Sequence, residues 1–414
     1  MLIAPARVPA TRRLAATLYG YAFLIDFVLL YPFYVLLFAD TGLSVGQISS
    51  LFVLWSATGI VLEVPSGAWA DAVSRRLLLV LAPLLAAAGF ALWVLVPSYP
   101  AFAAGFLLWG AGGALRSGAL EALVFTELDR LGAADRYARL IGRTRTAEVL
   151  GAAGSGAVAG PVFAAGGYPA VGVASILTCL LAAAVATRFP EHRSHRSSMP
   201  DAGVPGPTVP GDQSADGDDA PGWLASLRGG LAEARADRRV RGALLLVAVV
   251  TAIWGGLDEY TGLLARDTGV AEATVPLLLL LMWAGMTAGG LLAPMGERLT
   301  NRGYAGLLVL AASTLAAGAL IRRPEGFLLL AVAFAAFQVA TVLADVRLQA
   351  GITGTARATV TSVAGMATDL TIVAFYGGYG LVAGAAGNAV AFAVAALPYL
   401  AVALWQAAGR AAPR

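Results

Sequence analysis

The chain is dominated by apolar runs that are long enough to cross a membrane. A spanning helix needs about 20 mostly apolar residues, and twelve segments of the 414-residue chain reach that length. Their expected bounds are 14–38, 48–70, 77–96, 101–124, 143–165, 168–188, 240–264, 273–295, 304–321, 326–347, 358–380 and 385–407. This pattern predicts an all-α membrane protein with twelve transmembrane helices.

The placement of arginine predicts how these helices are oriented. Cytoplasmic loops of membrane proteins carry an excess of positive charge. With the N-terminus placed inside, 24 arginines fall in the inner loops and termini and three fall in the outer loops. The outer three are Arg266, Arg322 and Arg323, and one more, Arg116, lies within the fourth span. We therefore expect both termini to be cytoplasmic.

A long polar break divides the twelve spans into two sets of six. We expect an N-terminal six-helix half over residues 1–189, a cytoplasmic linker over 190–239 and a C-terminal half over 240–414. The linker is rich in proline, glycine, aspartate and serine, which predicts partial disorder.

The two halves also share a spacing, which indicates an internal repeat. Asp71-Ala-Val-Ser-Arg-Arg76 follows the second span, and Glu297-Arg-Leu-Thr-Asn-Arg302 follows the eighth. Internal repeats are typical of secondary transporters, so we expect two pseudo-symmetric halves.

Composition supports the membrane class and excludes several kinds of function. Charged residues make up only 13% of the chain, against about 25% in a soluble domain. The arginines form no long stripe with interleaved aromatic residues, so we expect no nucleic-acid partner. Cys179, His192 and His195 do not form a metal site, and no cofactor is expected. The chain has no lysine, which excludes an ATP-binding loop of the form GxxxxGK[ST].

Ionisable side chains within the spans are the candidates for function. Each costs at least about 2.5–3.5 kcal/mol to place in hydrocarbon, so it should face the protein interior or a water-filled cavity. The candidates for substrate binding or proton coupling are Asp26, Glu63, Arg116, Asp258, Glu259 and Asp369. Asp26 has only apolar sequence neighbours, and low-dielectric surroundings disfavour a charged carboxylate, which suits a proton carrier. At a rise of 1.5 Å per residue, Asp26 is about 12 residues into its helix and Asp369 about 11, so both should lie roughly in the middle of the membrane.

Structural roles remain open for several of these side chains. Asp258 and Glu259 belong to an outer loop if the seventh span ends early. Asp369 could simply accept hydrogen bonds from Thr368 or Thr371.

The same holds for three other carboxylates. Glu121 and Asp345 lie near inner helix ends, where they can be interfacial, and Glu148 can pair with Arg145.

One stretch resembles a signature of the major facilitator superfamily. The sequence GAWADAVSRR, Gly67 to Arg76, is similar to the family's loop between helices 2 and 3, with a glycine, an aspartate and a final basic pair. The usual pattern has a basic residue and a glycine where this chain has Ala72 and Ser74. The resemblance covers nearly the whole chain and implies a cytoplasmic gate that latches the two halves. Its residues here are Gly67, Asp71, Arg75, Arg76, Glu121, Glu297, Arg302 and Asp345.

The chemistry of this stretch fits such a gate. Gly67 would allow close helix approach, and Asp71 could accept hydrogen bonds at the N-terminus of a facing helix. The alternative is a pair of basic residues that only anchors the helix at the membrane surface.

Two further matches concern the fourth and fifth spans. The sequence GAVAGP resembles the glycine–proline motif of family members that export by antiport, with motif residues Gly156, Gly160 and Pro161. A helix-packing face of small residues explains the glycines equally well. Arg116 stands where the family often has a functional arginine. Together with the EVPSGxxAD form around Glu63, it resembles a bacterial drug-export-like branch.

These features predict a secondary active transporter and not an enzyme. We expect proton-coupled antiport that exports a small amphipathic organic compound or drug by alternating access between the halves. Aromatic side chains of the central spans could contact it, among them Tyr31, Tyr34, Trp55, Trp109 and Trp283. The alternatives are a proton-coupled importer of a sugar or metabolite and, more distantly, a membrane-embedded enzyme. The expected partners are the substrate, protons and the lipid bilayer, and the expected form is a monomer in the bacterial inner (plasma) membrane.

Overall fold

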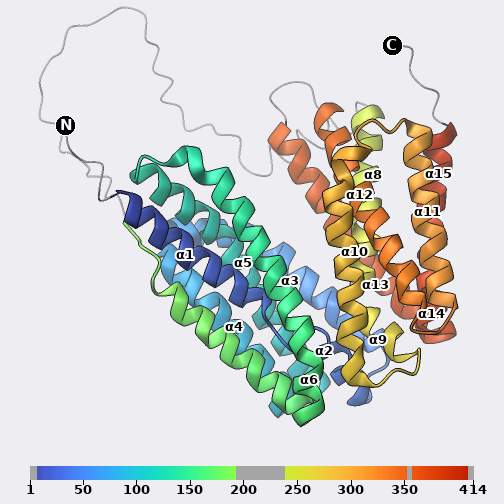
Figure 1. Ribbon diagram of the computed structural model, residues 1–414, viewed down its shortest axis with the longest axis horizontal. Helices are drawn as coiled ribbons and strands as arrows, with labels where there is room; N and C mark the ends of the chain where they lie inside the picture. Colours follow the sequence, from blue (N-terminus) through green and yellow to red (C-terminus); the bar gives the residue numbers. More distant parts are fainter. Residues whose placement is uncertain (1–6, 193–237, 352–356, 409–414) are drawn as a thin grey trace, which may run out of the picture.

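The computed structural model describes residues 7–192, 238–351 and 357–408, which are helical and contain no strand (Figure 1). The first part contains α1 (Arg7–Asp26), α2 (Tyr34–Asp40), α3 (Val45–Ala72), α4 (Arg75–Leu95), α5 (Tyr99–Arg130), the short 3-10 helix η1 (Ala134–Arg136) and α6 (Tyr137–Ala186). The second contains α8 (Arg238–Asp258), α9 (Thr261–Arg266), η2 (Glu272–Thr274), α10 (Val275–Gly296), α11 (Asn301–Leu320), α12 (Gly326–Gly351), α13 (Arg357–Ala386), α14 (Asn388–Val394) and α15 (Leu397–Ala408).

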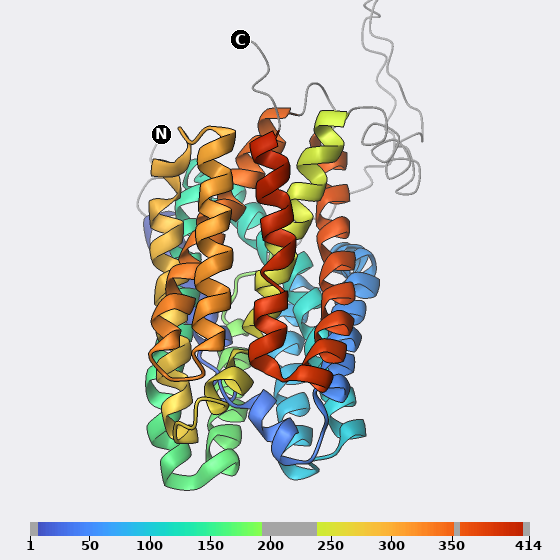
Figure 2. The ribbon, with the colours of Figure 1, turned by 90° about the vertical axis from the view of Figure 1, so that its right-hand side faces the viewer.

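The helices form two bundles, one from each part of the chain. In the first bundle α1 packs on α6, α3 on α5, and α4 on both α5 and α6. In the second, α12 contacts α8, α10 and α11, and Figure 2 shows this bundle in front of the first. The bundles meet through α3 with α13 and α6 with α10. They lean apart toward the end where α1 begins and α15 ends, and they converge at the opposite end, near α2 and α9 (Figure 1).

Nine helices among the described residues are long and apolar enough to cross a membrane. One of them, Ala134–Ala186, contains both the fifth and the sixth expected span, and Gly166 and Gly167 interrupt its helical geometry. The expected count of twelve and the cytoplasmic location of the termini stay predictions. Most of the expected linker, residues 193–237, lies outside the described residues.

The first and seventh spans are interrupted, whereas the sequence pattern predicted continuous helices. The chain leaves the helix after Asp26 and re-enters it at Tyr34, and it does so again between Asp258 and Thr261. Placing Asp26 in the middle of a continuous helix was therefore wrong. Pro32 supplies a physical reason, because proline has no N–H group and restricts the residue before it.

Buried side chains of α6 satisfy the backbone of the interrupted first span. Ser155 donates to the carbonyl of Val28 (2.7 Å), and Ser175 accepts from the N–H of Leu30 (2.9 Å). Both serines are fully buried. Irregular backbone at membrane depth is tolerated only where such partners replace the lost helix bonds, so these serines make the interruption possible.

The two loops of the internal repeat start the next helix in the same way. The Ser74 hydroxyl accepts a first-turn backbone N–H of α4 (3.0 Å), and the Thr300 hydroxyl accepts one of α11 (3.2 Å). Each follows the acidic residue of its repeat, Asp71 or Glu297, by three positions. Ser74 departs from the family pattern in sequence, and it is the N-cap of α4.

We expect Thr300→Ala to lower the free energy of unfolding by about 1 kcal/mol, because it removes a helix N-cap. Thermal denaturation of the detergent-solubilised protein measures this change. Ser98→Ala is the matched control, since Ser98 precedes α5 without a side-chain cap bond. Equal losses in the two variants would exclude capping as the cause.

Candidate functional site

A cavity of about 760 Å³ lies between the two bundles. Helices α1, α3, α4, α5, α8, α10 and α13 all contribute residues to its wall. The six side chains predicted for substrate binding or proton coupling line it, namely Asp26, Glu63, Arg116, Asp258, Glu259 and Asp369. The fold therefore brings together candidates that are far apart in the sequence, while their individual roles stay predictions.

The interrupted first and seventh spans present carboxylates to this cavity. Asp26 is the last residue of α1, and Asp258 is the last residue of α8, with Glu259 directly after it. The final carbonyl groups of a helix carry partial negative charge, and they favour a cation over another anion. Each break therefore combines a carboxylate with the negative end of a helix, which makes it a site for a proton or a positive group.

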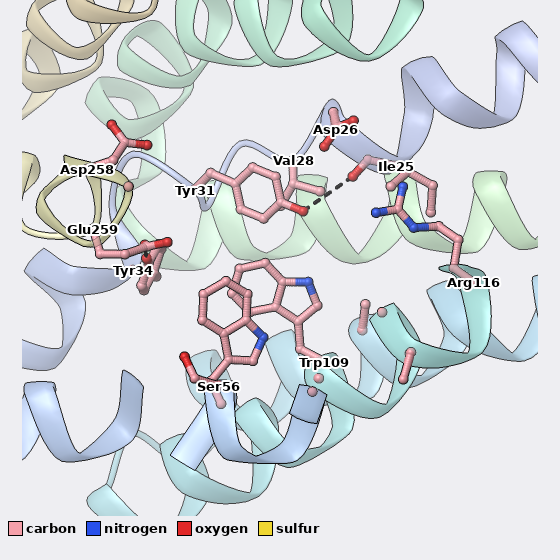
Figure 3. Close-up of a pocket in the computed structure, with 18 of the residues that line it drawn as sticks. Ile25, Asp26, Val28, Tyr31, Tyr34, Ser56, Trp109, Arg116, Asp258 and Glu259 are labelled. Atoms are coloured by element: carbon pink, nitrogen blue, oxygen red, sulfur yellow. Dashed lines mark hydrogen bonds between the residues drawn. The ribbon is translucent and has the colours of Figure 1, made fainter. Parts of the chain in front are cut away.

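Asp26 and Arg116 lie at one end of the cavity (Figure 3). The guanidinium of Arg116 is 3.9 Å from Glu148, and Glu148 also accepts a hydrogen bond from Arg145 (3.1 Å). The expected pairing of Glu148 with Arg145 is thus present, and Arg116 adds to it. Much of the Arg116 charge is consequently balanced within the first bundle.

Asp258 and Glu259 lie at the other end, next to Tyr34 (Figure 3). The Tyr34 hydroxyl donates to Glu259, and the Trp283 indole donates to Asp258 (3.4 Å). Tyr34 belongs to the first bundle and Glu259 to the second, so their hydrogen bond joins the bundles. Both carboxylates line the cavity, at the point where α8 ends. Their assignment to a span or to an outer loop stays a prediction.

Asp369 also lines the cavity, from α13. The alternative that it accepts hydrogen bonds from its threonine neighbours is wrong, because their hydroxyls donate elsewhere. Thr368 donates to the Ala364 carbonyl (2.9 Å) and Thr371 to the Ala367 carbonyl (2.7 Å).

An aromatic wall, formed by Tyr31, Trp55 and Trp109, separates the two acidic ends of the cavity. Trp55 and Trp109 are stacked with ring centroids 4.8 Å apart, and Tyr31 stacks on Trp109 at 5.4 Å. The Tyr31 hydroxyl donates to the Ile25 carbonyl (3.3 Å), which fixes the ring against the broken end of α1 (Figure 3). The wall offers a flat apolar surface between two charged regions.

The bundles are closed against each other beyond the Tyr34–Glu259 bond. Arg266, the last residue of α9, forms an ion pair with Asp40, the last residue of α2 (2.7 Å). Ser49 and Tyr260 share a further hydrogen bond between the bundles (2.7 Å). The sequence analysis missed these contacts, because nothing in a single sequence pairs residues more than 200 positions apart.

The predicted gate residues lie near the end where the bundles lean apart. Arg75 donates to the Ala122 carbonyl (3.1 Å) and to Thr126 (2.8 Å), both on α5 of the same bundle. Five others are exposed: Arg76, Glu121, Glu297, Arg302 and Asp345. The side chain of Asp71 lies outside the described part of the structure, and a latch between the halves stays a prediction.

The close approach expected at Gly67 depends on a different glycine. A Cβ atom added to Gly67 would meet no neighbour within 4 Å. One added to Gly118 of α5 would lie 3.2 Å from the Ser66 carbonyl and 3.4 Å from the Gly67 nitrogen. Gly118 therefore lets α5 approach this part of α3.

The glycines of the helix-5 motif lie at the contact between the bundles. A Cβ atom at Gly156 would lie 2.8 Å from Leu280 of α10, and one at Gly160 would collide with the carbonyl of Ala273 in η2. Pro161 is exposed. Helix packing therefore accounts for both glycines, while the link of this motif to export stays a prediction.

Comparisons with known proteins give a consistent result. A family model described as the Major Facilitator Superfamily matches residues 16–387. No curated protein matches the chain.

Solved transporter structures share the fold at low identity. The nucleoside transporter NupG has a TM-score of 0.69 at 12% identity, with 95% of this chain and 98% of that chain covered. A D-xylose–proton symporter has a TM-score of 0.65 at 16% identity, with 97% of both chains covered. A bacterial homolog of the human lysosomal transporter Spinster, inward-facing and occupied, has a TM-score of 0.67 at 15% identity, with 96% and 94% covered.

We expect Gly160→Ala to part the bundles at their closed end, because the new methyl group meets backbone that cannot turn aside. Overpacking costs about 1–3 kcal/mol, so the labelling rate of a buried cysteine there should rise about tenfold or more. Maleimide labelling of Ser49→Cys in a Cys179→Ala background measures this rate.

Gly142→Ala is the matched control on the same helix, because a Cβ atom there meets nothing within 4 Å. It should label at the rate of the parent protein. If both alanine variants label alike, contact with Ala273 does not hold the bundles together.

Proposed function

Because the chain belongs to the major facilitator superfamily, we propose that it is a proton-coupled antiporter that exports a small amphipathic organic compound. The family and the long apolar helices make it a multi-pass membrane protein and a transporter, not an enzyme. The cavity supports the proton coupling and the amphipathic character of the substrate. It combines ionisable side chains with an aromatic wall between two bundles that are closed at one end.

The distribution of contacts between the bundles supports alternating access. The start of α1, the connection between α5 and α6 and the end of α15 lie where the bundles lean apart, and we place this end in the cytoplasm of a bacterial cell. The closed end, with the Asp40–Arg266 ion pair, then faces outward. In this arrangement the structure corresponds to an inward-facing state, and transport requires the closed contacts to break while the gate residues around Asp71 come together.

The Tyr34–Glu259 hydrogen bond offers a physical link between protons and this change. A hydrogen bond to a carboxylate is roughly twice as strong as one between neutral groups. Protonation of Glu259 weakens its bond to Tyr34 and with it the closure of the outer end. The outward-open arrangement would thereby have the higher proton affinity, as any transporter that takes up external protons and releases them inside requires.

Import of a sugar or metabolite together with protons is the second candidate. The similarity to structures titled as a D-xylose–proton symporter and a nucleoside transporter favours it. The same cavity and the same carboxylates would serve both directions of transport, so the two candidates differ in the sign of the coupling.

A pH gradient across proteoliposomes separates the two candidates. An antiporter accumulates its substrate on the acidic side, whereas a symporter accumulates it on the alkaline side. The test panel should contain amphipathic compounds of positive, zero and negative charge, together with D-xylose and uridine. Accumulation that does not respond to the gradient for any compound would refute proton coupling.

We expect Asp26→Asn to abolish gradient-driven accumulation while the protein stays folded, because the amide cannot carry a proton. Asp129→Asn is the control, since Asp129 is exposed at the end of α5 and does not line the cavity. Size-exclusion profiles check folding, and transport by Asp26→Asn at the parental level would remove Asp26 from the coupling mechanism.

A further inference from the structure

We infer that the transported compound is an organic cation with a flat apolar body, and that its positive group binds at Asp258 and Glu259. This inference rests on the proposed function, because it takes the cavity between the bundles as the transport site. It adds the charge of the substrate, the end of the cavity that receives its charge, and the wall that receives its body.

The ionisable lining of the cavity is strongly biased toward negative charge. Its described residues include five carboxylates, from Asp26, Glu63, Asp258, Glu259 and Asp369, and one guanidinium, from Arg116. That guanidinium lies beside Asp26 and within 3.9 Å of Glu148. An anionic substrate would be repelled by this excess of carboxylates, and little positive charge is available to bind it.

Negative charge is least compensated at the Asp258–Glu259 end of the cavity, which is therefore where a positive group would bind most favourably. Arg116 lies away from it, and no ion pair to either carboxylate occurs among the residues that the structure describes (Figure 3). Their side-chain hydrogen bonds come from neutral donors, the Tyr34 hydroxyl and the Trp283 indole. Both side chains are half-buried at the cavity wall. Partial removal from water favours a counter-charge or a proton beside a carboxylate, and the C-terminal end of α8 adds further negative potential there.

The neighbouring rings suit a cation as well. Aromatic faces attract a positive group within about 6 Å of the ring centroid. Tyr34 stands beside Glu259, and its ring centroid is 6.2 Å from that of Trp109. From there the aromatic wall of Tyr31, Trp55 and Trp109 continues toward Asp26. A compound with its charge at Glu259 can therefore lay a flat apolar body along this wall.

The size of the cavity is compatible with such a ligand. Binding sites for drug-sized molecules are typically about 300–1,000 Å³, mostly apolar, with a few placed polar groups. A cavity of about 760 Å³ falls within that range. It can hold a multi-ring cation as a single body, whereas a small inorganic cation would leave the aromatic wall without a role.

Equilibrium binding of two probes with matched shape and opposite charge tests the inference. Tetraphenylphosphonium carries a permanent positive charge, and tetraphenylborate is its anionic counterpart. Both ions are tetrahedral, and each phenyl ring offers a flat apolar face that can lie against the aromatic wall. We expect the purified protein in detergent to bind the phosphonium at least tenfold more tightly than the borate, measured by calorimetry at mildly alkaline pH. Equal affinities, or tighter binding of the borate, would overturn the inference.

Substitutions locate the site of the positive charge. The double variant Asp258→Asn with Glu259→Gln should lose at least tenfold in phosphonium affinity, whereas Glu259→Asp, which keeps the charge, should lose less than threefold. Asp129→Asn should bind as the parent does. If the double variant is not monodisperse, the two single variants carry the test with a threefold threshold, and unchanged affinity in both overturns the inference.

These outcomes are separate from those of the proposed function, because binding is measured without a gradient. Charge-dependent binding at Asp258 and Glu259 without proton-driven transport would refute the coupling and leave the cation site intact. Proton-driven transport of a neutral or anionic compound, with no phosphonium binding, would refute the cation site and leave the coupling intact.

Discussion

The need to satisfy every backbone polar group inside a membrane is the constraint on which this structure depends. The first span can leave its helix after Asp26 only because Ser155 and Ser175 of α6 hydrogen-bond the exposed backbone. These two bonds allow a carboxylate to stand at a helix end beside a cavity. Without such partners a continuous helix would be favoured, and the wall of the cavity would differ.

In the second bundle the seventh span is interrupted after Asp258, where the nearby Thr261 hydroxyl donates to the Asp258 carbonyl (2.6 Å). The carboxylates at the two breaks lie at opposite ends of the aromatic wall, so each bundle supplies one end of the site (Figure 3). Glu259 takes its hydrogen bond from Tyr34, the first residue of α2. The break in the first span therefore also places Tyr34 where it connects the bundles. The charge of Glu259 thus affects a contact between the bundles.

Close packing of small residues holds the closed end of the bundles together. Gly156 and Gly160 bring α6 against α10 and η2, and the ion pair of Asp40 with Arg266 lies beside this contact region. In a membrane the hydrophobic effect contributes little to association between helices, so van der Waals contact between closely packed backbones and polar bonds stabilise it. Contacts of this kind can be broken and remade at modest cost, which suits a protein that alternates between two arrangements.

The sequence by itself determined the membrane class, the all-helical fold and the ionisable side chains that line the cavity. It could do so because a charge in an apolar run has few tolerable positions, and each of the six candidates, from Asp26 to Asp369, is such a charge. The GAWADAVSRR stretch and the repeat at Glu297 also indicated the family directly. The role of Ser74 as a cap was available from the repeat, since Thr300 occupies the same place.

Only the tertiary structure decided how these residues are arranged. The break after Asp26, the pairing of Tyr34 with Glu259 and the ion pair of Asp40 with Arg266 depend on partners from distant helices. Hydrophobic periodicity describes one segment at a time, so it predicts a continuous helix wherever the run is apolar. Whether a helix breaks is decided by the groups that replace its lost hydrogen bonds, and those groups meet only when the helices pack.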